Sequence, residues 1–123
     1  MSRRPPKKRV DYMAQADALF SKLIRSRGVC ESDRPSHSGN LQCAHIITRG
    51  YKSIRTLEEK ALCLCQGCHV YFTFHPLEWE LFIESRFPGR MGMLRERALK
   101  YERVDWRVEV KKLKASVGSV VNP

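Results

Sequence analysis

Residues 63–69 read CLCQGCH and place three cysteines and one histidine in seven positions. Cys65 and Cys68 have the CxxC spacing that lets two thiolates bind one metal ion across a tight turn, and Gly67 allows the backbone to turn toward it. A redox-active CxxC is the alternative, but such a pair normally opens a helix after a strand in a βαβ unit, and no such pattern surrounds this one. The stretch therefore predicts a metal site whose other ligands come from elsewhere in the chain.

The remaining cysteines suggest those ligands. The chain has five cysteines, and an odd number argues against a disulfide framework. Two of them bracket the turn-forming segment 31–41 and could complete a tetrahedral zinc site. The expected zinc ligands are Cys30, Cys43, Cys65 and Cys68. Cys63 could replace Cys43, since alternate residues of a strand point to the same face, whereas His37 is interpreted as a solvated loop residue.

The charge balance indicates a polyanionic partner. Lys and Arg total 23 against 13 acidic residues, a formal net charge of +10. This excess favours nucleic acid, although the charge could also serve solubility alone. A membrane surface is disfavoured, because no basic helix with a broad apolar face is found. No apolar run approaches the roughly 20 residues of a membrane span, and no apolar stretch follows the N-terminus, so we expect a cytoplasmic protein with reduced thiols.

The pattern along the chain predicts one domain between two disordered ends. Residues 1–10 are expected to form a flexible basic arm that contacts phosphates. The arm's basic residues are Arg3, Arg4, Lys7, Lys8 and Arg9. Residues 11–114 are assigned to the domain, and residues 115–123 to a disordered tail.

Periodicity gives the secondary structure of the domain. Apolar residues at spacings of three and four predict a helix over 11–27, with Asp11 as its N-cap and Gly28 at its end. QCAHIIT at 42–48 predicts a strand. Three further helices are expected after Pro76, and their apolar faces indicate core packing or a homodimer face.

The order C…CAHII…R…LCLCQGCH…FTFHP resembles the HNH endonucleases, the ββα-metal group. It is most similar to small phage and prophage HNH proteins, including the NinG-type recombination proteins. The resemblance runs from about Ala14 to Leu113: AQADALFSKLIRSRGVC resembles their lead-in helix, CAHIITRGYKSIR with LCLCQGCH their core motif, and PLEWELFIESRFPGRMGMLRERALKYERVDW their helical tail. It implies an α+β fold in which a two-stranded hairpin and a helix surround one divalent ion. The N-terminal helix, the zinc-binding cysteines and the helical tail add to this core.

The resemblance also implies roles for single residues. His45 matches the general base that activates water against a phosphodiester of double-stranded DNA. His69 matches the ligand of a catalytic Mg²⁺, Mn²⁺ or other divalent ion, with participation in the zinc site as the alternative. Arg55 matches an arginine of the motif and is expected to be catalytic, and either Arg55 or Arg49 could clamp a phosphate.

Two positions depart from the family pattern. Lys60 stands where the family usually has Asn, and an ammonium cannot bind a metal, although it could contact a phosphate. Ala44 stands where a second metal ligand is common. His75 could compensate as a ligand of the catalytic ion, and Glu59 is a second candidate.

Three functions therefore compete. A metal-dependent endonuclease explains the histidines, the cysteines and the charge together. A zinc-stabilised nucleic-acid-binding protein without cleavage activity explains the two departures. A thiol redox protein leaves the charge unexplained.

Overall fold

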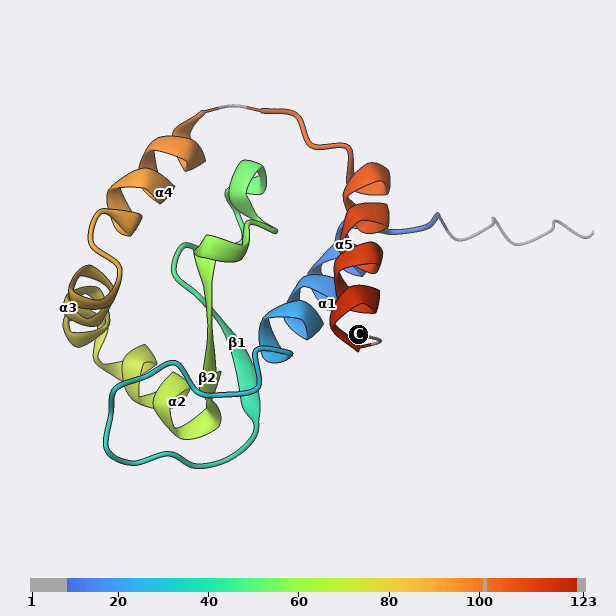
Figure 1. The fold of residues 1–123 in the computed structure, drawn as a ribbon. Helices are drawn as coiled ribbons and strands as arrows, with labels where there is room; N and C mark the ends of the chain where they lie inside the picture. The colour runs from blue at the N-terminus through green and yellow to red at the C-terminus, as the bar shows by residue number, and fades with distance from the viewer. Residues whose placement is uncertain (1–8, 101, 122–123) are drawn as a thin grey trace, which may run out of the picture.

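The computed structural model describes residues 9–100 and 102–121, and its helices lie on both sides of a small central sheet (Figure 1). The elements are α1 (Tyr12–Arg25), β1 (Leu41–His45), the 3₁₀ turns η1 (Lys52–Ile54) and η2 (Glu58–Lys60), β2 (Ala61–Cys65), α2 (Gln66–Phe74), α3 (Pro76–Arg86), α4 (Arg90–Leu99) and α5 (Trp106–Val121). The expected mixed α+β class is confirmed. No helix in this part of the chain is long and apolar enough to cross a membrane.

The two strands separate two hydrophobic cores. β1 runs antiparallel to β2, with Cys43 opposite Cys63 and Gln42 opposite Leu64. Every residue of β2 is buried, and alternate residues of a strand point to opposite faces. Ala61 and Cys63 therefore enter the core formed with α1 and α5, while Leu62 and Leu64 enter the core formed with α2 and α3. Cys65, the last residue of the strand, departs from this alternation and joins the second core.

The predicted first helix is confirmed as α1. Asp11 is its N-cap: the Ala14 N–H donates to the Asp11 carboxylate at 2.9 Å, which satisfies one of the free N–H groups of the first turn. Gly28 follows the helix at φ +80°, a conformation that glycine adopts without strain. The stripe that faces the sheet comprises Ala16, Phe20, Leu23 and Ile24, all buried.

The prediction of a disordered tail over 115–123 is wrong for residues 115–121. The helix α5 continues to Val121, and Val117 is buried against α1. The physical reason is that Val117 extends the apolar spacing of Val110 and Leu113 by one helical turn, so this turn has a face to bury. Of the predicted basic arm, Arg9 is exposed, and residues 1–8 lie outside the described part.

The free edge of β2 is covered by the segment that follows α1. The Glu31 N–H donates to the Cys63 carbonyl at 2.8 Å, and the Cys63 N–H donates to the Glu31 carboxylate at 2.8 Å. Arg27 also donates to the Ala61 carbonyl at 3.0 Å and pairs with Glu31. The backbone N–H and carbonyl of Cys63 and the carbonyl of Ala61 therefore have partners on the edge of β2 that β1 does not cover, as a buried strand requires.

The connection between the strands is tied to α1 by an ion pair. Arg55 donates from Nε to Asp17 Oδ1 at 2.8 Å and from Nη2 to Asp17 Oδ2 at 2.6 Å. Only 14% of the Arg55 side chain and 17% of the Asp17 side chain are exposed. The hydrogen bonds from Arg55 lower the pKa of Asp17, so the carboxylate is the stable form in the folded protein.

Asp17→Asn is expected to lower the free energy of unfolding by about 2 kcal/mol at pH 7, because a partly buried guanidinium loses its charged acceptor. Urea denaturation of the zinc-loaded protein measures this loss. Glu80→Gln is the matched control: its partner Arg95 lies 3.4 Å away and both side chains are exposed, so the change should be about 0.5 kcal/mol or less.

The same pair predicts a pH dependence. Because the pKa of Asp17 is lowered on folding, its contribution is present above the ordinary carboxyl pKa of about 3.9 and is lost as the pH falls through the folded value. The difference between wild type and Asp17→Asn should therefore shrink on acidification. A difference that stays constant down to pH 3 would contradict an ionic role for Asp17.

Candidate metal centre and neighbouring cleft

Three cysteines and one histidine converge beside the start of α2. The side chains of Cys30, His37, Cys65 and Cys68 place their ligand atoms within 4.8 Å of one another. His37 Nδ1 lies 3.4 Å from Cys68 Sγ and 3.7 Å from Cys65 Sγ. A tetrahedral zinc ion with ordinary Zn–S and Zn–N bonds would separate such atoms by about 3.6 Å. The four side chains therefore fit a structural zinc ion.

The backbone around α2 holds this cluster together. The N–H groups of Gln66 and Gly67 donate to the carbonyls of Asn40 and Ser38, both at 2.9 Å. A side chain at position 67 would meet the Ser38 hydroxyl, which would then have to rotate away. Glycine allows the two segments to approach without that change. These contacts fix the loop that carries His37 against the first turn of α2.

The electrostatics of Cys65 suit metal binding. Burial alone would raise the pKa of its thiol, but hydrogen bonds from the Cys68 and Ser38 backbone N–H groups and from the His37 side chain outweigh it and lower the pKa to about 6. A thiol with such a pKa is largely ionised at neutral pH, and the thiolate is the form that binds metal.

The predicted four-cysteine site is wrong in one ligand, because Cys43 does not reach the cluster. Cys43 lies opposite Cys63 in the sheet, on the face that packs against α1 and α5. Cys65 and Cys68 belong to the core on the other side. Burial raises the pKa of Cys43 to about 11, so it stays a thiol. Cys63, the alternative, lies on the same face as Cys43, with its sulfur 4.0 Å from the Arg25 carbonyl.

His37 is the fourth ligand of the cluster, so its interpretation from the sequence as a solvated loop residue is wrong. The signal that could have found it is its place in a turn-rich loop that starts directly after one ligand, Cys30, and returns to β1. A loop of glycine, serine and proline is free to fold back on the CxxC turn, whereas a strand residue is committed to one face of the sheet.

A cleft of about 230 Å³ lies next to this centre, between the end of β1 and α2. Both predicted catalytic histidines, His45 and His69, line it. The lining is completed by Ala44, Leu64, Phe72, Thr73, Pro76 and Trp79. The structure thus brings together two residues that lie 24 positions apart in the sequence and that the motif comparison paired.

His45 is held as a neutral imidazole. Burial, followed by the positive charges of Lys60 and Arg49, lowers its pKa to about 4. Its ring stacks on Phe20 of α1 with a centroid separation of 6.1 Å. Its Nδ1 is buried and has no hydrogen-bond partner among the described residues. A buried polar atom of this kind lacks the hydrogen-bond contact that such groups usually have.

His69 is oriented by β1. Its Nδ1 lies 2.7 Å from Gln42 Oε1, and its backbone carbonyl accepts a hydrogen bond from the Thr73 hydroxyl at 2.8 Å. Burial lowers the pKa of His69. His69 lies outside the zinc-type cluster, although it follows Cys68 directly. It therefore belongs to the cleft.

Lys60 is fully buried, which contradicts its prediction as a phosphate contact. Its Nζ donates to the Arg55 carbonyl at 3.0 Å and lies 6.0 Å from the Phe20 ring centroid. Burial lowers the pKa of this ammonium to about 8. The apolar stem of Lys60 packs in the interior, so its charge acts on His45 through space and does not meet a ligand at the surface.

The two motif arginines differ in what they offer. The guanidinium of Arg55 is engaged by Asp17 and by the Arg49 carbonyl at 2.8 Å, so the prediction that it clamps a phosphate is wrong for this arrangement. The Arg49 side chain is 56% exposed and 3.7 Å from Asp17, which leaves it able to meet a ligand.

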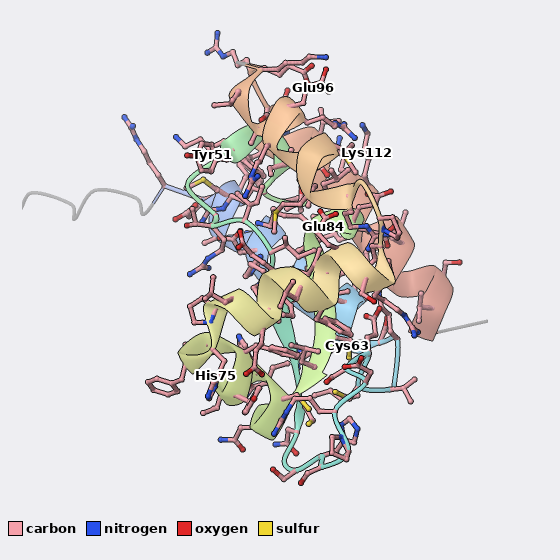
Figure 2. All side chains as sticks on the ribbon, turned by 90° about the vertical axis from the view of Figure 1, so that its left-hand side faces the viewer. Tyr51, Cys63, His75, Glu84, Glu96 and Lys112 are labelled. Carbon is pink, nitrogen blue, oxygen red and sulfur yellow. The ribbon has the colours of Figure 1, made fainter. Side chains whose placement is uncertain are left out.

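His75 does not reach the cleft, so the predicted pair of His69 and His75 as metal ligands is wrong. His75 caps α2, its Nδ1 lies 2.7 Å from the Tyr71 carbonyl, and its ring stacks on Tyr71. Figure 2 shows it at the outer edge of the molecule. Within residues 9–100 and 102–121 the zinc-type cluster is the one group of three or more His, Cys, Asp or Glu side chains close enough to share an ion. His45 and His69 are thus the only His, Cys, Asp or Glu side chains among the residues that line the cleft.

The zinc site predicts a contrast between His37→Ala and Cys43→Ala. His37→Ala should weaken zinc binding by more than the roughly 10–100-fold that loss of an outer hydrogen-bond partner costs, because it removes a direct ligand. Cys43→Ala should keep about one zinc per chain. Competition with a colorimetric chelator, with metal content by elemental analysis, measures both. Loss of zinc in Cys43→Ala but not in His37→Ala would restore the four-cysteine site.

Comparison with known proteins adds no assignment to this geometry. No protein-family model, no curated protein and no solved structure matches the chain. The case for a function therefore rests on the residues of the metal centre and the cleft.

Proposed function

We propose that this chain is an HNH-type endonuclease, stabilised by zinc, that hydrolyses phosphodiester bonds of DNA with His45 as general base. The observation that carries the proposal is the cleft in which a neutral His45 at the end of β1 faces the same space as His69 of α2. The chain order β1, β2, α2 supports it, since this is the order that the resemblance implies. The net charge of +10 supports a polyanionic substrate.

In the proposed reaction His45 removes a proton from the attacking water. Its Nε2 lies 4.0 Å from Cys43 Sγ, whereas its buried Nδ1 has no partner among the described residues. Nδ1 would accept that proton once water enters the cleft beside it. The water oxygen then bonds to phosphorus and the bond to the leaving oxygen breaks. With a pKa near 4, His45 is almost wholly unprotonated at pH 7. Exposed Arg49 is placed to bind a neighbouring phosphate.

A divalent ion at His69 would supply stabilisation of the negative charge that develops on the phosphate and the leaving oxygen. Its remaining positions would come from phosphate and water oxygens, as is usual where a protein offers few ligands. An imidazole without carboxylates favours Ni²⁺ or Mn²⁺ over Mg²⁺.

A second candidate is a zinc-stabilised DNA-binding protein that does not cleave. The buried ammonium of Lys60 favours it, because it stands where the family usually has an Asn and cannot bind a metal. Incubation of supercoiled plasmid with Mg²⁺, Mn²⁺ or Ni²⁺, with and without EDTA, separates the two. Binding without cleavage under every metal condition would favour the second candidate.

His45→Ala should reduce the cleavage rate at least about 100-fold, the low end for loss of a general base. Zinc content and DNA affinity should stay near wild type, because His45 lies outside the zinc cluster. His75→Ala is the matched control: it removes an imidazole that lies outside the cleft and should cut like wild type. Equal cleavage by His45→Ala and His75→Ala would rule out the proposed mechanism.

The pH profile gives an independent test. Because the pKa of His45 is about 4, kcat/KM for the free enzyme should stay constant as the pH falls from 7.5 to 6. An exposed histidine with a pKa near 6.5 would lose roughly fourfold over the same range. Suppose instead that kcat/KM of the wild type falls fourfold over this range, and that the residual activity of His45→Ala shows no such fall. This result would contradict the buried, neutral state of His45.

A further inference from the structure

The contact between Gln42 and His69 joins the sheet to the cleft, and it has no part in the mechanism above. Gln42 lies on β1 opposite Leu64. It is two positions before Ala44, so both side chains point to the face that α2 covers. Gln42 is half-buried, and its Oε1 lies 2.7 Å from His69 Nδ1.

The chemistry of this contact restricts the histidine. An amide oxygen only accepts hydrogen bonds, so the ring nitrogen that faces it must carry the proton. A neutral imidazole has one N–H, and the proton on Nδ1 leaves the lone pair on Nε2.

We propose that Gln42 is a positioning residue that holds His69 in the Nδ1–H tautomer and so presents the unprotonated Nε2 to the cleft as an electron-pair donor. The part that concerns a divalent ion rests on the proposed function. The part that concerns the tautomer does not. In this state His69 donates no proton from Nε2, so it acts as a ligand and not as the acid that protonates the leaving oxygen.

Two features of the structure and one general observation support this role for Gln42. Its backbone is fixed by the antiparallel pairing with β2, so the amide cannot follow a moving ring. The ring is fixed from the other side because α2 is anchored through Gln66 and Gly67 to the loop before β1. Histidine ligands of metals in proteins commonly donate their second ring N–H to such an oxygen, which sets the tautomer.

Long-range ¹H–¹⁵N correlation spectra of the zinc-loaded chain at pH 7 test the tautomer directly, with the His69 signals assigned by their loss in His69→Gln. We expect a protonated Nδ1 and an unprotonated Nε2. Gln42→Ala should shift the proton toward Nε2, the form that a solvated imidazole prefers. Gln42→Glu keeps an acceptor oxygen at the same place and should retain the Nδ1–H form.

Gln15→Ala is the matched control, since Gln15 is an exposed glutamine on α1 and should leave the His69 signals unchanged. A wild-type His69 protonated on Nε2 would overturn the proposal, because Gln42 would then present its NH₂ group to the ring. A tautomer that Gln42→Ala leaves unchanged would also overturn it.

Cleavage measurements test the part that concerns the ion. Gln42→Ala should raise the Mn²⁺ concentration for half-maximal plasmid cleavage about 10–100-fold, and Gln42→Glu should not. Mn²⁺ is the probe because it prefers oxygen and nitrogen ligands and leaves the thiolate cluster to zinc. If wild type does not cleave, the proposed endonuclease fails while the spectra still decide the role of Gln42. If Gln42→Ala changes the tautomer but not the Mn²⁺ requirement, His69 is not the ligand.

Discussion

At the junction of β2 and α2 the chain turns from strand to helix within one residue, and this turn is held by side chains from far upstream. Cys65 ends the strand, Cys68 lies in the first turn of the helix, and Cys30 and His37 reach them from the loop after α1. A domain with two small cores has little apolar area with which to fix a nine-residue helix. An ion bound by these thiolates would supply folding free energy at this point. The position of α2, and with it the position of His69 in the cleft, depends on this cluster.

The region on the other side of β1 is organised by charge. The carboxylate of Asp17 holds the guanidinium of Arg55, and Arg55 in turn accepts the Lys60 ammonium at its backbone carbonyl. Of these groups, Lys60 and Asp17 act on the pKa of His45 through space, Lys60 lowering it and Asp17 raising it. One consequence is that Lys60, which the motif comparison assigned to phosphate contact, acts on the charge state of His45. Arg49 acts on His45 in the same direction, but its side chain remains exposed.

The sequence allowed the local features to be predicted and left the long-range ones open. The Asp11 cap and the apolar stripe of α1 follow from spacing alone, as does the CxxC pair. The choice of Cys43 over His37 failed because a strand pattern does not say which face of the sheet meets the metal. The burial of Lys60 was also not predicted. Nor was the ion pair between Asp17 and Arg55, which lie 38 positions apart in the sequence. Such contacts arise only when the elements pack, so no local pattern indicates them.

The segment that begins at Cys30 serves two purposes at once. One residue after this ligand, Glu31 occupies both the carbonyl and the N–H of Cys63 and so covers the outer edge of β2. The segment that supplies a metal ligand thus also shields β2, whose sequence ALCLC is apolar and carries no charge. Unpaired edges of this kind recruit strands from other chains. Release of the metal would therefore expose a template for intermolecular strand pairing, and the solubility of the chain becomes linked to its metal occupancy.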